Sequence, residues 1–233
     1  MLGPLQYANW VISFLLEVGV VISVFLIPQL YRYISIAAYM LAAALVNVAQ
    51  YMCIERFGFT SRQYYYSYYY GETLLTILMF FVIIQFYRHV LAEMHVGKYI
   101  RGIATLLLAG TALFSYLVIQ QNRGHLTNEF VVQVGENLYF VGVVLTYLLW
   151  GAIVKLGETR TRLVHLVLAL GIYFSANAGI YALRKLFPGL EPGLYYWVPP
   201  LIGTWLPLAW IYTLLKVPEE ARFATAHLAV RTR

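Results

Sequence analysis

Long apolar stretches separated by short polar segments make up most of the chain. Seven of these stretches are 18 to 23 residues long, which is enough for a helix to cross the hydrocarbon core of a bilayer. We therefore predict an all-α, polytopic membrane protein whose seven transmembrane helices lie at about residues 10–30, 34–54, 65–87, 102–121, 138–155, 163–183 and 194–216. The fifth stretch has an alternative, earlier start, because Glu129 and Glu136 frame a weaker apolar run. Counts of six or eight helices are the alternatives.

The composition agrees with a membrane environment. Hydrophobic residues make up 61% of the chain, charged residues only 11%, and the mean hydropathy is +0.70. A bilayer rather than water is therefore the expected solvent. We expect one transmembrane domain, residues 1–216, followed by a short cytoplasmic tail, residues 217–233. The predicted location is the cell (inner or cytoplasmic) membrane, as a multi-pass protein.

Basic residues are unequally distributed between the two predicted membrane faces. One face carries five of them: Arg56, Arg62, Arg123, Arg184 and Lys185. The other face carries eleven: Arg32, Arg88, Lys98, Arg101, Lys155, Arg160, Arg162, Lys216, Arg222, Arg231 and Arg233. The positive-inside rule makes the second face cytoplasmic, so we predict the N-terminus outside and the C-terminus inside. The net charge of +6 then indicates the anionic lipids of the bilayer as a partner, and not nucleic acid.

An internal repeat emerges when the chain is aligned with itself at an offset of 130 residues. The offset pairs Arg32 with Arg162, Asn47 with Asn177, Tyr51 with Tyr181, Phe57 with Phe187, and Tyr65-Tyr66 with Tyr195-Tyr196. It superimposes the second and third predicted helices on the sixth and seventh, and the first on the fifth, with the fourth as a connector. Such a parallel three-plus-one-plus-three repeat is one of the symmetries of transporters. Coincidence in a Tyr-rich and Ala-rich chain is the alternative.

The layout resembles that of the PQ-loop and SWEET-type transporters, in which a Pro-Gln pair breaks the cytoplasmic end of the first helix. Pro28-Gln29 lies at that place, whereas the equivalent place in the second triplet holds Glu158-Thr159 and no Pro-Gln pair. This resemblance implies a transporter built from two three-helix units. The whole chain also resembles small bacterial seven-helix integral membrane proteins with a Tyr-rich start to the third helix, which implies no particular activity.

Two acidic residues, Glu17 and Glu72, lie inside predicted helices, where an ionised carboxylate is costly. At a rise of ~1.5 Å per residue, they share with Asn47 and Asn177 a depth of about 9 to 11 Å below the predicted outer boundary. Helical spacing brings further polar residues onto the same helix faces. We therefore predict a ligand- or ion-binding set of nine residues: Glu17, Glu72, Asn47, Gln50, Asn177, Tyr65, Tyr69, Tyr173 and Tyr181.

Two interpretations of this polar layer are open. In the first, Asn and protonated Glu side chains form hydrogen bonds between helices and only hold the bundle together. In the second, the carboxyl groups line an outward-facing cavity, where they bind protons or a cation. Pro199-Pro200 lies at a similar depth and should kink or open the seventh helix, which would free carbonyl groups for binding.

The segment Tyr64–Tyr70 contains six tyrosines in seven residues. Tyrosine is enriched at the membrane–water boundary, so an aromatic belt is one explanation. Seven consecutive residues go all the way round a helix, however, so some of the rings must face the bundle. Together with Tyr195, Tyr196 and Trp197, these inward rings could form a collar for a flat, cationic or sugar-like ligand.

The sequence contains no signature of catalysis or of cofactor binding. The five histidines are scattered, and none has another His or Cys at metal-ligand spacing, so we expect no metal site. A retinal pigment needs a lysine in the middle of its last helix, and the only lysine there is Lys216 at the end. Phosphate-binding glycine loops, nucleophile elbows and zinc-protease motifs are not found. We expect neither enzymatic activity nor a cofactor.

The favoured function is that of a carrier-like integral membrane protein. It would bind a small solute in an outer-facing polar and aromatic cavity, with Glu17 and Glu72 as proton- or cation-binding groups. One alternative is a seven-helix sensor that signals to a cytoplasmic partner, and another is a structural subunit of a membrane complex. Neither the identity of the ligand nor the oligomeric state follows from the sequence.

Overall fold

The computed structural model describes residues 4–58, 60–91, 110, 126–156, 161–187 and 192–219. Over these ranges the chain is helical and contains no strand, which confirms the all-α prediction. The elements are α1 (Pro4–Leu26), η1 (Pro28–Tyr33), α2 (Ile34–Phe57), α3 (Arg62–Val90), α5 (Leu126–Leu156), α6 (Thr161–Leu186) and α7 (Pro192–Lys216). Six helices of the described ranges are long and apolar enough to cross a membrane. The predicted helix 102–121 and the tail after Glu219 lie outside the described residues.

Several helix ends differ from the prediction. The first helix does not run to residue 30 but ends at Leu26, because Pro28 has no amide hydrogen and its ring clashes with the preceding turn. The fifth helix is already present at Leu126 and does not begin at 138, so it includes the weaker apolar run framed by Glu129 and Glu136. The third extends to Val90 and not only to 87.

Sequence analysis predicted that Pro199 and Pro200 kink or open the seventh helix. The structure shows that they do not open it. α7 continues as an α-helix through Pro199 and Pro200 to Lys216. Pro199 and Pro200 remove the amide hydrogens that would bond to the carbonyl groups of residues 195 and 196, yet the helix continues past them. Asn9 of α1 donates to the Pro200 carbonyl over 3.3 Å, which ties this part of α7 to the adjacent helix.

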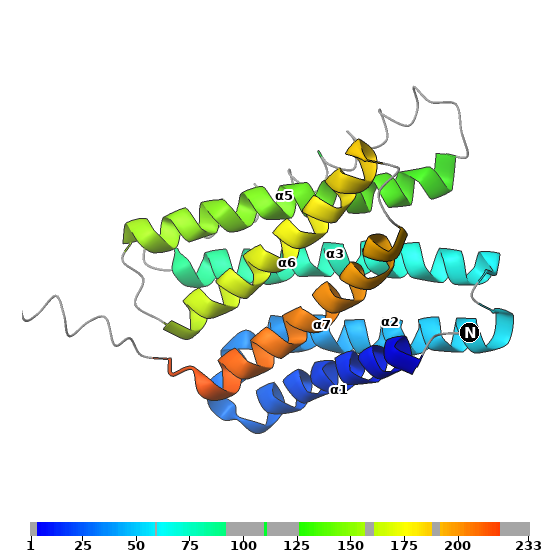
Figure 1. The fold of residues 1–233 in the computed structure, drawn as a ribbon. Helices are drawn as coiled ribbons and strands as arrows, with labels where there is room; N and C mark the ends of the chain where they lie inside the picture. The colour runs from blue at the N-terminus through cyan, green and yellow to red at the C-terminus, as the bar shows by residue number, and fades with distance from the viewer. Residues whose placement is uncertain are drawn as a thin grey trace, which may run out of the picture.

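The six long helices form a closed ring (Figure 1). They pack against one another in the order α1, α2, α3, α5, α6 and α7, and α7 packs back against α1. α1, α3, α5 and α7 all begin at one end of the ring, here named end A, and finish at the other, end B. Neighbours are therefore antiparallel except for the pairs α3 with α5 and α7 with α1, which run in the same direction.

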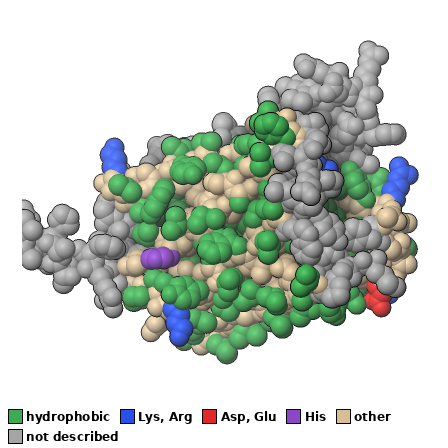
Figure 2. Space-filling model, in the orientation of Figure 1, with side chains coloured by type: hydrophobic (Ala, Val, Ile, Leu, Met, Phe, Trp, Pro, Cys, Tyr) green, Lys and Arg blue, Asp and Glu red, His purple; other side chains and the backbone are tan. Residues whose placement is uncertain are grey.

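The outer surface of the ring is apolar between its two ends. On the face shown in Figure 2, the Lys and Arg side chains lie toward the ends of the molecule, and hydrophobic side chains cover the surface between them. Along α1, for example, Ile12, Leu15 and Ile22 are each at least half exposed. Such a surface is stable in contact with lipid, in agreement with an integral membrane protein.

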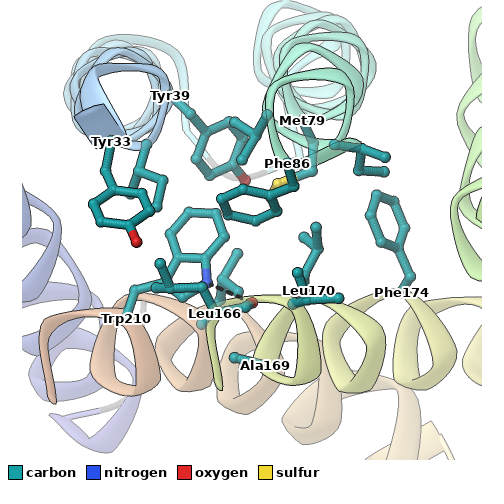
Figure 3. Close-up of a cluster of buried hydrophobic side chains, with 14 of the residues drawn as sticks. Tyr33, Tyr39, Met79, Phe86, Leu166, Ala169, Leu170, Phe174 and Trp210 are labelled. Atoms are coloured by element: carbon teal, nitrogen blue, oxygen red, sulfur yellow. Dashed lines mark hydrogen bonds between the residues drawn. The ribbon is translucent and has the colours of Figure 1, made fainter. Parts of the chain in front are cut away.

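The interior of the ring is filled with apolar side chains in the half nearer end B. Figure 3 shows Phe86, Leu170, Phe174 and Trp210 pointing toward one another from α3, α6 and α7. All four are completely buried. The indole nitrogen of Trp210 donates to the Leu166 carbonyl of α6 over 3.3 Å, so its one polar group is also satisfied.

At end B, Glu219 holds together segments that are far apart in the sequence. Its carboxylate accepts hydrogen bonds from Arg32 in η1, from the Tyr33 hydroxyl over 3.1 Å, and from Arg162 at the start of α6 over 2.9 Å. Arg162 also donates through Nε to the Val217 carbonyl over 2.9 Å. We call these four residues, Arg32, Tyr33, Arg162 and Glu219, the Glu219 clasp. It joins the start of α2, the start of α6 and the end of α7.

At end A, a short turn joins α2 to α3. Gly58 follows α2 with φ of +81°, a conformation that glycine adopts without strain. Ser61 then caps α3: its hydroxyl oxygen accepts from the Tyr64 amide over 3.1 Å and donates to the Gly58 carbonyl over 2.8 Å. This turn fixes the start of α3, and with it the Tyr64–Tyr70 segment, at end A.

Close packing of α5 against α6 gives a first testable prediction. A Cβ atom added at Gly142 would lie 2.3 Å from the Phe174 ring, which is buried and has no room to move. Gly142→Ala should therefore lower the free energy of unfolding by about 1–3 kcal/mol through overpacking. Thermal unfolding of the detergent-solubilised protein measures this as a lower midpoint.

Gly151 is the matched control, because it lies on the same helix, is exposed and has nothing within 4 Å of an added Cβ. Gly151→Ala should leave the midpoint unchanged or raise it slightly, since alanine favours helix. The double variant Gly142→Ala, Phe174→Leu should recover part of the loss. Equal effects of the two glycine substitutions would contradict the packing described here.

Candidate functional site

A cavity of about 850 Å³ occupies the interior of the ring in the half nearer end A. Side chains of α1, α2, α3, α6 and α7 line it. Its inner limit is formed by residues at the boundary of the apolar core, among them Tyr39, Met40, Leu75 and Leu206. Thr60, which is exposed at the α2–α3 turn, also lines the cavity, so the cavity reaches the surface at end A.

All nine residues of the predicted binding set line this one cavity. They come from four helices: Glu17 from α1, Asn47 and Gln50 from α2, Tyr65, Tyr69 and Glu72 from α3, and Tyr173, Asn177 and Tyr181 from α6. The residues that were grouped by helical spacing and by depth therefore do lie around one cavity. Whether they bind a ligand stays a prediction.

Glu17 is almost completely buried in the cavity wall, with 5% of its surface exposed. Both of its carboxyl oxygens lie 2.8 Å from Nδ2 of Asn47, which donates to them across the α1–α2 interface. The Ser13 hydroxyl, one turn earlier on α1, donates a longer bond of 3.4 Å. Gly19, half a turn further along, is close to Ile211 of α7, so α1 is held between α2 and α7 at this depth.

Glu72 takes its partner from a different helix. The Tyr139 hydroxyl of α5 donates to its Oε2 over 3.3 Å. Tyr139 is itself buried and stacks on Tyr181 of α6, with ring centroids 5.5 Å apart. The two acids that sequence analysis singled out thus lie in one cavity, each held by a neutral donor from a neighbouring helix.

Both interpretations of the polar layer find support in this geometry. The bonds from Asn47 to Glu17 and from Tyr139 to Glu72 join separate helices, as the first interpretation requires. The same carboxyl groups line a cavity, as the second requires. The same two carboxyl groups therefore both join helices and line the cavity.

Aromatic side chains dominate the rest of the wall. Of the Tyr64–Tyr70 segment, the tyrosines that line the cavity are Tyr64, Tyr65, Tyr68 and Tyr69. Tyr70 is 46% exposed and does not line it, so it fits the belt rather than the collar. The proposed collar partners Tyr195, Tyr196 and Trp197 have side chains outside the described part of the chain.

The α7 side of the wall carries exposed backbone. Pro207 has no amide hydrogen, so the Gly203 carbonyl cannot accept the usual helical bond from residue 207. Gly203 and Pro207 both line the cavity. On the same helix, the Pro200 carbonyl accepts from Asn9 and from the Thr204 hydroxyl over 3.1 Å. Backbone acceptors of α7 therefore contribute to the polar character of the wall.

Sequence analysis missed several residues of the site. Tyr139 escaped because the fifth helix was predicted to begin at 138, which would place this residue at a membrane boundary and not deep in the bundle. Trp10 and Tyr39 line the cavity but follow no polar pattern; Trp10 stacks on Tyr51 with centroids 5.1 Å apart. Arg184 was recognised only as a membrane-face charge, although it lies on the wall.

Comparison of the chain with protein-family models, curated proteins and solved structures finds no match. In the described ranges, no three His, Cys, Asp or Glu residues are grouped as metal ligands. Function is therefore inferred from the cavity and from the arrangement of the helices around it.

The bond between Asn47 and Glu17 gives a second testable prediction. Asn47→Ala would leave the buried Glu17 carboxyl with only the long bond from Ser13. The free energy of unfolding should fall by about 1–2 kcal/mol, because a buried carboxyl that loses its donor is not compensated by lipid. Thermal unfolding in detergent is again the measurement.

Asn177 supplies the control for this prediction. It lines the same cavity, but its amide donates to the Tyr173 carbonyl of its own helix over 2.9 Å, so among the described residues Asn177→Ala breaks no bond between helices. Its cost should stay within about 0.5 kcal/mol. If the two alanine variants unfold at the same temperature, the α1–α2 bond does not contribute as described.

Proposed function

We propose that the protein is a carrier-like integral membrane protein that binds a small solute in the cavity at end A, with Glu17 and Glu72 as the groups that bind the solute, a proton or a cation. The observation that carries this proposal is the convergence of all nine predicted residues on one cavity of about 850 Å³. Ligand sites typically have volumes of about 300 to 1,000 Å³ and combine apolar walls with a few polar groups.

The contrast between the two halves of the ring supports a carrier. The cavity reaches the surface at end A, whereas the half nearer end B is filled by the apolar core and tied by the Glu219 clasp. A carrier exposes its site to one side of the membrane at a time. The arrangement matches a state that is accessible from end A and closed at end B.

The order of the helices around the ring supports the parallel repeat. α1, α2 and α3 form one half of the ring, and α5, α6 and α7 form the other in the same order. This agrees with a transporter of two three-helix units, as the resemblance to PQ-loop and SWEET-type proteins implies.

Several of the residues that the offset pairs lie in the same part of the ring. Asn47 and Asn177 both line the cavity, as do Tyr51 and Tyr181. The paired arginines, Arg32 and Arg162, both bind Glu219 at end B. Composition alone does not account for pairs that share a location as well as a residue type, so these pairs favour the repeat over coincidence.

The direction of the helices supports a seventh crossing. α3 and α5 run in the same direction: Gly135 lies near Thr73, and the Tyr87 hydroxyl further along donates to the Leu145 carbonyl over 2.7 Å. The chain must therefore return from end B to end A between α3 and α5. The predicted helix 102–121 lies in that interval. If it is the seventh crossing, the predicted orientation makes end A, where α1 begins, the outer face and end B the cytoplasmic face.

The two alternatives receive less support. A structural subunit needs no cavity, so a polar cavity of this size speaks against that role. A sensor would also bind a ligand at end A, but it needs a change at end B that a cytoplasmic partner can read. Co-purification separates the two, because a sensor should bring down such a partner and a carrier need not.

The carrier hypothesis gives a third testable prediction. Solutes that raise the unfolding midpoint of the purified protein identify candidate substrates, and each is then tested for uptake into proteoliposomes. Glu72→Gln should reduce the uptake of a transported solute at least tenfold, since it removes a negative charge from the wall. Glu55→Gln, which changes an exposed residue of α2 outside the cavity, is the control.

Unchanged uptake by Glu72→Gln would remove this carboxyl group from the mechanism. If a solute binds but is not taken up in either direction, and a cytoplasmic partner co-purifies, the sensor hypothesis is favoured over the carrier hypothesis. Right-side-out and inside-out vesicles, prepared separately, also test the orientation: binding at end A should be accessible only from the outer face.

The Glu219 clasp gives a fourth testable prediction. In the proposed carrier, opening toward end B must break the bonds from Arg32 and Arg162 to Glu219. Glu219→Gln weakens both ion pairs but changes no residue of the cavity wall. We expect the maximal uptake rate to change at least threefold, while the dissociation constant of the solute stays within twofold. A rate equal to that of the unmodified protein would show that the clasp is not part of a gate.

A further inference from the structure

The charge balance of the cavity wall indicates which kind of ligand it fits. Among the described residues of the wall, Glu17 and Glu72 are acidic and Arg184 is basic. Within the described residues, Asn47, Ser13 and Tyr139 donate to the two carboxyl groups, and all three are neutral. The salt bridges found in the same ranges involve Glu219 at end B and neither of these acids.

A buried acid with only neutral donors favours a positively charged partner. Burial of a carboxylate is costly unless a positive charge compensates it, and hydrogen bonds from amides and phenols compensate only in part. Glu17 is 5% exposed, so bulk water gives it little further help. The positive charge must come either from a proton or from a ligand that reaches the cavity from end A.

The aromatic wall favours an organic cation over a proton alone. Electron-rich ring faces attract ammonium and guanidinium groups, and the attraction is stronger where water is excluded. Tyrosines line the cavity from three directions: Tyr51 on α2, Tyr64, Tyr65, Tyr68 and Tyr69 on α3, and Tyr173 and Tyr181 on α6. Trp10 adds a ring from α1, stacked on Tyr51. A proton or a small inorganic ion would use neither these rings nor a volume of about 850 Å³.

Arg184 lies at the outer part of the wall. It belongs to the last turns of α6 near end A and is exposed, whereas Glu17 lies in the middle of α1 and is buried. A ligand that enters therefore passes a region with one positive charge before it reaches two acids. An anion would be held at the entrance and disfavoured further in, where both charged groups are acidic.

We propose that the cavity at end A selects organic cations, with an ammonium or similar group held between Glu17 and Glu72 and an apolar or aromatic body held by the tyrosine rings. This inference rests on the proposed function and specifies its substrate class. It assigns complementary roles to the two kinds of side chain: the carboxyl groups select charge, and the rings select an apolar surface next to that charge.

The test compares three small ligands that differ mainly in charge: benzylammonium, benzyl alcohol and benzoate. Each is titrated into the detergent-solubilised, full-length protein and followed by calorimetry and by tryptophan fluorescence, because Trp10 lines the cavity. Methylammonium and tetramethylammonium extend the series to smaller cations. We expect at least one cation to bind, benzylammonium at least tenfold more tightly than benzyl alcohol, and no binding of benzoate.

Variants of the wall then locate the binding. Glu17→Gln and Glu72→Gln should each weaken the binding of the cation at least tenfold, and the double variant should abolish it. Glu55→Gln removes an equal charge from an exposed position outside the cavity and should leave the affinity unchanged. For the rings, Tyr69→Phe should bind benzylammonium at least fivefold more tightly than Tyr69→Leu, since only the former keeps an aromatic face.

Folding and binding are separated by the unfolding midpoint of each variant, measured without ligand. A variant that unfolds below the temperature of titration is replaced by Glu17→Asp or Glu72→Asp, which keep the charge but shorten its reach and should still weaken the binding. The proposal is overturned if no cation of the series binds, if benzyl alcohol binds as tightly as benzylammonium, or if the Gln variants bind the cation like the unmodified protein.

Uptake into proteoliposomes distinguishes this inference from the carrier function on which it rests. Uptake of a neutral solute that depends on Glu72, without preference for cations, would leave a carrier and overturn the substrate class. Cation binding that depends on both acids, without uptake, would keep the ligand class and overturn the carrier.

Discussion

A polar side chain at membrane depth has to find its partner inside the bundle, because lipid offers none. This constraint explains the main features of the structure. Glu17 and Glu72 both turn toward the interior of the ring, where Asn47 and Tyr139 reach them from adjacent helices. The apolar residues on the opposite sides of the same helices then face outward. The Asn47–Glu17 bond thus determines which faces of α1 and α2 point inward at end A, and the Tyr139–Glu72 bond does the same for α5 and α3.

The same constraint accounts for the difference between the two halves of the ring. Near end B the interior positions carry large apolar residues such as Phe86 and Trp210, which are completely buried. Near end A the interior positions carry carboxyl, amide and phenol groups. Their donors and acceptors must lie at hydrogen-bonding distance from one another, which close packing alone does not provide. A space of about 850 Å³ with such a wall is suited to hold water or a polar ligand.

The sequence was most informative where a single physical cost determines the outcome. The length of the apolar stretches predicts the helices. The cost of an acid in hydrocarbon singles out Glu17 and Glu72, and the other members of the set follow from their depth and their helical spacing. The order of helices around the ring and the Glu219 clasp were not predictable, because Arg32 and Glu219 are far apart in the chain and follow no common period. Tyr139 was missed because two acidic residues interrupt the apolar run at the start of α5, which hid its true length.

The proposed carrier couples events at the two ends through the same helices. Glu17 and Glu72 belong to the first half of the ring, whereas Tyr173, Asn177 and Tyr181 of the cavity wall belong to the second. A bound solute would therefore join the two halves at end A, as Glu219 joins them at end B through Arg32 of the first half and Arg162 of the second. In a carrier whose halves move as units, new contacts at one end would compensate for those lost at the other. A single acid that serves both arginines suits this exchange, since its two ion pairs would be broken by one movement.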